Sequence, residues 1–137
     1  MTSRRCHQVS VGTILRRDGR YLLLRSGNEW GIVGGWLEAG EDVYQGLARE
    51  IREETQVEAE ILTAIDAHTY LHPERGPVVS IIFISTHRGG EVRLSHEHES
   101  YRWCSADEIL SGQILLGYPS ERGLFAKAFR LFALYDG

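Results

Sequence analysis

The sequence predicts an α/β fold in which a β-sheet is flanked by helices. Short segments with alternating or continuous apolar residues, such as 9–15 and 78–86, are typical of strands. Two longer segments, 42–55 and 119–134, repeat apolar residues at helical spacing. Both kinds of element occur within one short chain, which favours a sheet covered by helices.

The first strands are expected at residues 9–15 and 21–24, joined as a hairpin by the turn signal Asp18-Gly19. A further strand is expected around Trp36-Leu37. Before it, Gly34-Gly35 predicts a turn-rich segment whose backbone can approach a ligand or a metal.

The central helix is predicted at residues 42–55. Its apolar stripe, formed by Val43, Leu47, Ala48 and Ile51, can pack on the sheet and leave the charged face of the helix at the rim of a cleft.

The remaining elements follow the same patterns. Strands are expected at residues 59–68, 78–86 and 101–104, and helices at 106–110 and 119–134. The last helix has apolar side chains for docking, and these are Leu124, Phe125, Phe129 and Leu131.

The 137 residues are expected to form a single domain, 1–137, because no linker or repeat divides them. The start lacks a secretory signal, and no apolar run is long enough to cross a bilayer. These features predict a cytoplasmic protein without a membrane partner.

The composition excludes several classes of function. A net charge of −4 offers no basic stripe for polymeric nucleic acid. Cys6 and Cys104 are far apart and lack a ligand pattern, so the sequence indicates neither a disulfide framework nor a structural zinc. They are interpreted as packing residues.

Three carboxylates of the central helix are predicted to converge. Glu50, Glu53 and Glu54 stand at positions i, i+3 and i+4, which share one face of a helix. Such a cluster also occurs on solvated surfaces. The flanking glycines, and Gly46 inside the helix where glycine costs about 1 kcal/mol relative to alanine, favour a metal site instead. Magnesium prefers such oxygen ligands together with substrate phosphates.

The segment resembles the signature of the Nudix hydrolase family, G-x5-E-x7-R-E-U-x-E-E-x-G-U, where U is a bulky aliphatic residue, and is MutT-like. The positions that match are Gly35, Glu41, Arg49, Glu50, Ile51, Glu53, Glu54 and Val57. Gln56 replaces the second glycine. That glycine is expected to take a left-handed conformation past the helix end, so Gln56 should cost stability and leave the chemistry unchanged.

The resemblance implies an α/β/α sandwich around a mixed sheet and the Mg²⁺-dependent hydrolysis of a diphosphate linkage, with Mn²⁺ able to replace Mg²⁺. It implies that Glu53 and Glu54 bind the metal and that Glu50 is a third ligand or the general base. A carbonyl of Gly34 or Gly35 should complete the shell. Arg49 is expected to orient the carboxylates, and Glu41 to tie the preceding loop to the helix.

A second acidic stretch, residues 96–99, resembles the place where many family members carry another catalytic glutamate. Glu97 fits best and Glu99 competes with it, and a solvated loop is the alternative. His96 and His98 lack a cysteine or a third histidine that would complete a zinc site, so zinc is not predicted.

The substrate is less well defined by the sequence. Trp30 and Tyr70 are candidates for stacking on a base, although aromatic residues in such places often only pack. Arg25 is a candidate phosphate contact. In size the chain resembles the small members of the family, which act on free nucleotides, more than the larger ADP-ribose hydrolases. The resemblance therefore implies a nucleoside triphosphate or another small nucleotide, with ADP-ribose or a nucleotide sugar as alternatives.

Two other classes of function stay open at this stage. One is a nucleotide-sensing module without catalysis, which intact carboxylates disfavour. The other is an isoprenoid diphosphate isomerase, which would need a cysteine near the site. The resemblance also leaves open a homodimer, the number of metal ions and the phosphorus that is attacked.

Overall fold

The computed structural model describes residues 6–117 and 120–136. In these residues the chain forms seven strands and three helices. The strands are β1 (Gln8–Arg17), β2 (Arg20–Ser26), β3 (Glu29–Gly31), β4 (Val33–Trp36), β5 (Glu58–His72), β6 (Gly76–Gly89) and β7 (Ser100–Ser105). The helices are α1 (Val43–Thr55), α2 (Ala106–Leu110) and α3 (Arg122–Asp136).

The strands form one mixed sheet with the path β3-β2-β1-β6-β5. Only β1 and β6 are parallel, and the other pairs are antiparallel. Strand β4 pairs with the first half of β1, while β2 pairs with its end and also binds β7. Because β1 changes partner along its length, the sheet forks at β4.

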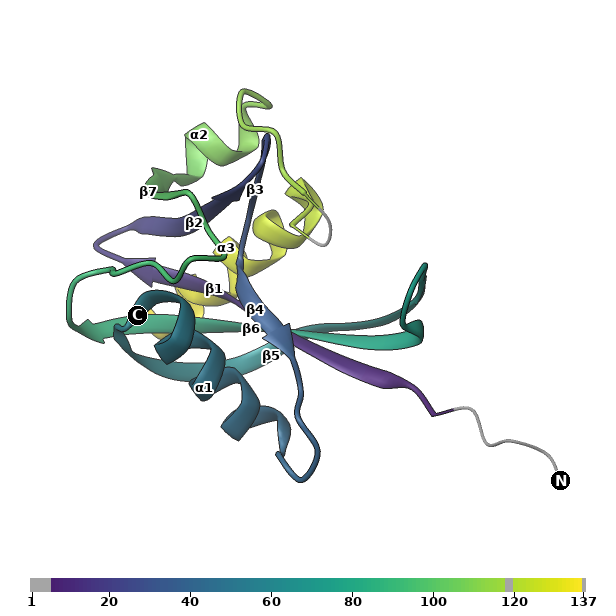
Figure 1. The fold of residues 1–137 in the computed structure, drawn as a ribbon. Coiled ribbons are helices and arrows are strands. Elements are labelled where there is room, and N and C mark those ends of the chain that lie inside the picture. Colours follow the sequence, from purple (N-terminus) through teal and green to yellow (C-terminus); the bar gives the residue numbers. More distant parts are fainter. Residues whose placement is uncertain (1–5, 118–119, 137) are drawn as a thin grey trace, which may run out of the picture.

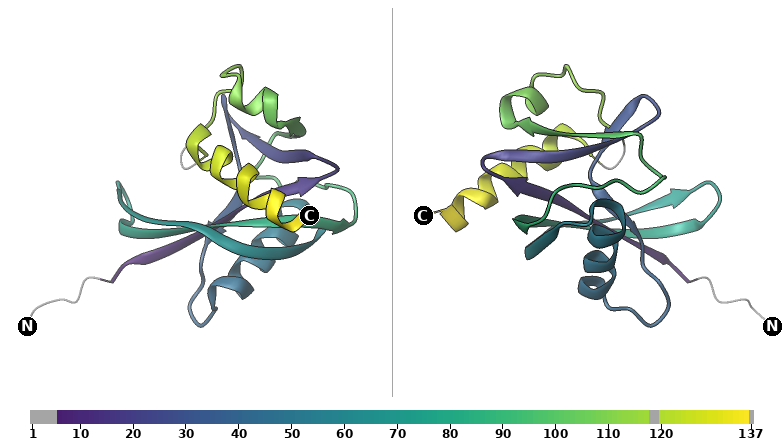
Figure 2. Two further views of the ribbon diagram at one scale, coloured as in Figure 1. Left: turned by 180° about the vertical axis from the view of Figure 1, so that it is seen from behind. Right: turned by 60° about the vertical axis from the view of Figure 1, so that its left-hand side comes forward.

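Helix α1 covers one face of the sheet, and α2 and α3 lie on the other (Figures 1 and 2). The two faces have separate cores because neighbouring residues of a strand point to opposite sides. On β1, Leu15 packs with Leu47 and Ile51 of α1. Ile14, the preceding residue, packs with Phe125 of α3. This arrangement confirms the predicted α/β/α sandwich.

Helix α1 begins and ends close to the predicted positions. Asp42 caps its start, where its side chain accepts a hydrogen bond from the Gln45 amide and the Gln45 side chain accepts one from the Asp42 amide. The helix ends at Gln56, whose φ of 59° is left-handed. The predicted conformation at this position is therefore confirmed.

The prediction of a turn at Gly34-Gly35 is wrong, because both residues lie in strand β4. A Cβ at position 34 would come within 2.4 Å of the Val11 carbonyl oxygen on β1. Gly34 thus allows two strands to approach closely, which is a use of glycine inside a sheet.

Other predictions need smaller corrections. The pattern does not predict β3, since three residues are too few to show an alternation. Ala48 is exposed, because it borders a groove between α1 and β5 and does not face the core. Cys104 is buried as expected of a packing residue, whereas Cys6 is exposed. Helix α3 begins at Arg122, and the predicted start at Pro119 lies outside the described residues. None of the helices in the described residues is long and apolar enough to span a membrane.

Candidate active site

The predicted metal ligands and catalytic groups border one cavity. It has a volume of about 610 Å³ and lies between α1, β4 and the segment that precedes β7. The predicted residues that line it are Gly34, Gly35, Arg49, Glu50, Glu53, Glu54 and Glu97. We call it the acidic cavity.

Arg49 organises the carboxylates of the acidic cavity. Its guanidinium donates to Glu41 (2.7 and 3.0 Å), to Glu50 (2.9 Å) and to Glu53 (3.2 Å). It also donates to the Trp36 carbonyl (2.9 Å), which ties α1 to the end of β4. Glu41 in turn accepts the Glu38 amide (2.8 Å) and so holds the loop that leads into the helix. These are the contacts that orienting roles for Arg49 and Glu41 require, and the roles themselves stay predictions.

Glu50 is held against the backbone of Gly35. A Cβ at position 35 would lie 2.4 Å from the Glu50 carboxyl carbon, so the cavity needs glycine there. Burial raises the pKa of Glu50, the nearby charges of Glu54 and Glu53 raise it further, and Arg49 opposes the shift. The Glu50 carboxylate thus carries a charge that its protein neighbours only partly balance.

Glu54 is almost fully buried, with 3% of its surface exposed. One of its oxygens accepts the Gly34 amide (2.8 Å), and the other contacts Nε2 of His98. This contact with Glu54 raises the pKa of His98. Ligand atoms of Glu54, Glu97 and His98 all lie within 4.8 Å of one another, an arrangement that could hold a metal ion.

The donor set of the acidic cavity suits a hard divalent cation. Five carboxylates line the cavity, from Glu38, Glu50, Glu53, Glu54 and Glu97, and Arg49 is the only arginine or lysine among the described residues that line it. An excess of converging carboxylates is costly unless a cation relieves it. The cavity can therefore hold a divalent metal together with the phosphates of a substrate.

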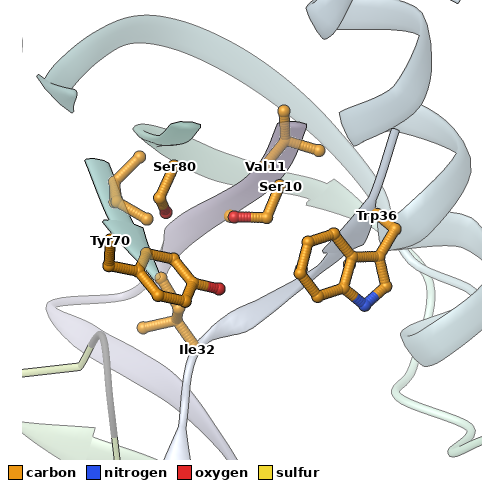
Figure 3. Close-up of a pocket in the computed structure, with 10 residues that line it drawn as sticks. Ser10, Val11, Ile32, Trp36, Tyr70 and Ser80 are labelled. Atoms are coloured by element: carbon orange, nitrogen blue, oxygen red, sulfur yellow. The ribbon is translucent and has the colours of Figure 1, made fainter. Parts of the chain in front are cut away.

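A second cavity opens next to the first. It measures about 250 Å³, and Gly34, Gly35 and Trp36 line both. Trp36 and Tyr70 stand on opposite sides of it, with Ser10 and Ser80 between them (Figure 3). None of the described residues that line it is charged. We call it the neutral pocket, and its aromatic walls suit a flat, uncharged group.

The comparisons with known proteins agree with this geometry. The profile of the NUDIX domain matches residues 7–128. The chain belongs to the Nudix family.

A MutT-like protein of Streptomyces ambofaciens is 36% identical over 99% of this chain and 82% of its own length. An ADP-ribose pyrophosphatase of Methanocaldococcus jannaschii is 33% identical over 62% of this chain and 54% of its own. The crystal structure of a MutT protein from Methanosarcina mazei Go1 superposes with a TM-score of 0.77, at 27% identity, over 96% of this chain and 99% of that one. The chain is therefore a Nudix hydrolase.

In this Nudix hydrolase, the geometry separates the two acidic candidates before β7. Glu97 lines the acidic cavity. Glu99 points elsewhere, where it accepts the Gly27 amide (3.1 Å) and pairs with Arg25 (3.3 Å). Glu97 is thus placed for a role in the site and Glu99 for a structural one.

The predicted substrate contacts are scattered. Tyr70 lines the neutral pocket, whereas Trp30 lines a third cavity of about 360 Å³ and packs partly against the core. Arg25 is bound to Glu99, and its buried Nε has no hydrogen-bond partner among the described residues. The structure therefore does not bring Trp30, Arg25 and Tyr70 into one site, and their roles stay predictions.

Sequence reasoning missed several residues of the site, among them Trp36, Ser80 and His98. Trp36 carried no signal beyond its place in a strand, and Ser80 interrupts an apolar run without any motif. His98 was set aside because no zinc pattern surrounds it. The only available signal was that His98 stands one residue from Glu97, since its partner Glu54 is 44 positions away.

Proposed function

We propose that this Nudix hydrolase cleaves the diphosphate linkage of a nucleoside triphosphate or a similar small nucleotide in a Mg²⁺-dependent reaction. One observation carries the proposal. The acidic cavity and the neutral pocket share Gly34, Gly35 and Trp36. A single nucleotide can therefore place its phosphates beside the carboxylates and its base between Trp36 and Tyr70.

The residues present have the oxygen donors that Mg²⁺ requires. Glu53 and Glu54, with a carbonyl of Gly34 or Gly35, would hold the ion, Glu50 would be either a third ligand or the general base, and Mn²⁺ could take the place of Mg²⁺. When bound, the metal neutralises phosphate oxygens and polarises the phosphorus toward attack by water. Arg49 keeps the carboxylates in position through the hydrogen bonds described above.

A carboxylate then has to accept a proton. The oxygen of a water molecule forms a bond to phosphorus, the bond to the bridging oxygen breaks, and the leaving phosphate keeps the electron pair. Glu50 and Glu97 both lie in the cavity and are the candidates for taking the proton of the water.

A second candidate function follows from one relative. The Methanocaldococcus jannaschii protein is named an ADP-ribose pyrophosphatase, so ADP-ribose is the alternative substrate, and nucleotide sugars share its diphosphate linkage. An isomerase finds no support in the cavity. Cys104 is fully buried, which raises the pKa of its thiol, and neither described cysteine lines the acidic cavity.

The test is a panel of nucleoside triphosphates, ADP-ribose and nucleotide sugars, incubated with Mg²⁺ and then with chelator, with products identified by mass. We expect hydrolysis of at least one nucleoside triphosphate, abolished by the chelator. Activity that persists with chelator would refute the mechanism, and cleavage of ADP-ribose alone would select the alternative.

Substitution of the carboxylates tests the site itself. Glu53→Gln and Glu54→Gln should each lower kcat by several orders of magnitude, because the negative charge that binds the cation is lost while the shape of the side chain is kept. Glu58→Gln is the matched control, since Glu58 is exposed at the start of β5 and does not line the cavity. Circular dichroism should show the same fold in all three variants. A mere twofold loss in both site variants would remove them from the mechanism.

A further inference from the structure

The hydroxyl of Ser80 on β6 opens onto the neutral pocket. Ser80 is 2% exposed and lines this pocket, and its oxygen is not one of the buried side-chain atoms that lack a partner in the described residues. Two other buried polar side chains have partners within the protein. The Thr13 hydroxyl pairs with that of Ser85 (2.7 Å), and the Ser120 hydroxyl accepts the Ile32 amide (3.0 Å). Ser80 therefore differs from these two residues, because its hydroxyl is open to a pocket.

A hydroxyl in the wall of a pocket needs water or a ligand as its hydrogen-bond partner, whereas valine or alanine at the same strand position would need none. The neighbours of Ser80 on its face of β6, Val78 and Ile82, are buried and apolar. A serine in this row is explained if a ligand supplies that hydrogen bond.

The location of the hydroxyl indicates the ligand. Ser80 borders the neutral pocket, and Ser10 lies beside it in the parallel register of β1 and β6. In Figure 3 the two serines lie on the sheet between Trp36 and Tyr70. Trp36 is itself held by the Arg75 guanidinium, 3.9 Å from its ring centroid, and by the edge of His72.

We propose that Ser80, with Ser10 beside it, binds the hydrogen-bonding edge of a nucleobase that stacks between Trp36 and Tyr70. The proposal rests on the proposed function and adds which part of the substrate enters the neutral pocket. The described lining lacks charged side chains, so the pocket suits a base and not a phosphate. A hydroxyl can donate or accept, so this contact favours nucleotides with a polar base edge over those without one, and does not choose between natural bases.

The experiment compares wild type with Ser80→Ala on three substrates. These are a natural nucleoside triphosphate that the enzyme cleaves, the same triphosphate with indole as base, and inorganic tripolyphosphate. For the natural nucleotide, Ser80→Ala should raise KM about tenfold and leave kcat nearly unchanged, because a binding contact is lost. For the other two substrates the variant should equal wild type, since neither has a polar base edge.

Ser100→Ala is the matched control, because Ser100 is half-buried on β7 and lines neither cavity. It should leave every KM unchanged. An unchanged KM for the natural nucleotide in Ser80→Ala would overturn the proposal. An equal rise in KM for all three substrates would also overturn it, because that result means a general distortion of the site.

Binding of free nucleosides without metal separates this proposal from the proposed function. Calorimetry should show adenosine or guanosine binding to wild type about tenfold more tightly than to Ser80→Ala. If wild type cleaves no nucleotide, the proposed function fails, and the nucleoside measurement still decides the role of Ser80. If nucleotides are cleaved but nucleosides bind both proteins equally, only the role of Ser80 fails.

Discussion

At the scale of single residues, Arg49 shows how one side chain affects the pKa values of its neighbours. Its planar guanidinium binds Glu41 through two nitrogens and reaches Glu50 and Glu53 with a third. Bound in this way, Glu41 stays charged to low pH. Glu50 is more buried and is approached by other carboxylates, and its pKa moves upward instead.

The Glu41 contact predicts a specific pH dependence of stability. The hydrogen bonds from Arg49 and from the Glu38 amide lower the pKa of Glu41 from 4.5 to about 2. Because this pKa is lower in the folded chain, the contribution of Glu41 is complete above about pH 4.5 and is lost as the pH falls through about 2. Glu41→Gln should therefore melt below wild type at pH 6, and the difference in Tm should shrink between pH 4.5 and 2. Thermal melts of both proteins at several pH values, with chelator present, measure this difference in Tm. A difference in Tm that does not vary with pH would contradict the lowered pKa of Glu41.

Gln56 gives a second prediction at the residue scale. Its φ of 59° lies in the region that glycine occupies without strain. Gln56→Gly should stabilise the protein by about 1 kcal/mol, or raise Tm by about 3 °C. Gln56→Ala is the control, since alanine has the same Cβ penalty and should bring no gain. Turnover should not change, because Gln56 does not line the acidic cavity. If Gln56→Gly melts at the same temperature as wild type, the backbone at position 56 carries no strain.

At the scale of helices and strands, the sequence predicts the features that depend on the local pattern of residues. Helix α1 has a capping residue, an apolar stripe and a left-handed end, and its predicted bounds differ from the observed ones by one residue at the start. The prediction at β4 is wrong because Gly34 serves a contact with β1, more than 20 positions earlier, and Gly35 makes room for Glu50 of α1. Local sequence shows that glycine is present and not which partner requires it.

The two glycines of β4 should respond differently to the same substitution. In Gly34→Ala the new Cβ would meet backbone atoms of Val11 and Gly12 at 2.4 and 2.8 Å, which forces β1 and β4 apart. We expect a loss of stability of about 1–3 kcal/mol or more. In Gly35→Ala the Cβ would meet the Glu50 carboxylate, which is a side chain and can turn away.

Gly35→Ala should therefore keep most of its stability and lose metal affinity and turnover. Chemical denaturation in chelator and titration with Mn²⁺ separate the two effects. The reverse order of stabilities, or an unaffected Mn²⁺ affinity in Gly35→Ala, would show that the two positions have been assigned the wrong neighbours.

In the site, as in the fold, features set by local spacing could be predicted and features set by distant parts of the chain could not. The carboxylates of α1 could be predicted because their spacing on one helix determines that they share a face. The choice between Glu97 and Glu99 could not, because both lie in an irregular segment before β7 whose path depends on the rest of the molecule. The neutral pocket could not be predicted either, since Ser10, Trp36, Tyr70 and Ser80 come from four strands.

At the scale of the whole molecule, strand β4 joins two chemically different sites. Its glycines and Trp36 line both the acidic cavity and the neutral pocket. The whole of β4 pairs with β1, and its end is also tied to α1 by the hydrogen bond from Arg49 to the Trp36 carbonyl. A ligand in one cavity therefore contacts the same short strand as a ligand in the other.

This arrangement predicts that metal and nucleotide stabilise the protein cooperatively. A non-hydrolysable nucleoside triphosphate analogue with Mg²⁺ should raise Tm by more than the sum of the two separate shifts, because each ligand adds contacts for the other. A free nucleoside reaches only the neutral pocket, so its shift should simply add to that of Mg²⁺. In Glu53→Gln the cooperative part of the Tm shift should disappear, while the Tm shift caused by the free nucleoside remains. In Trp36→Ala the Tm shift caused by the free nucleoside should be lost. Strict additivity for the triphosphate in wild type would mean that the two cavities do not bind one ligand, and the proposed mode of substrate binding would then be wrong.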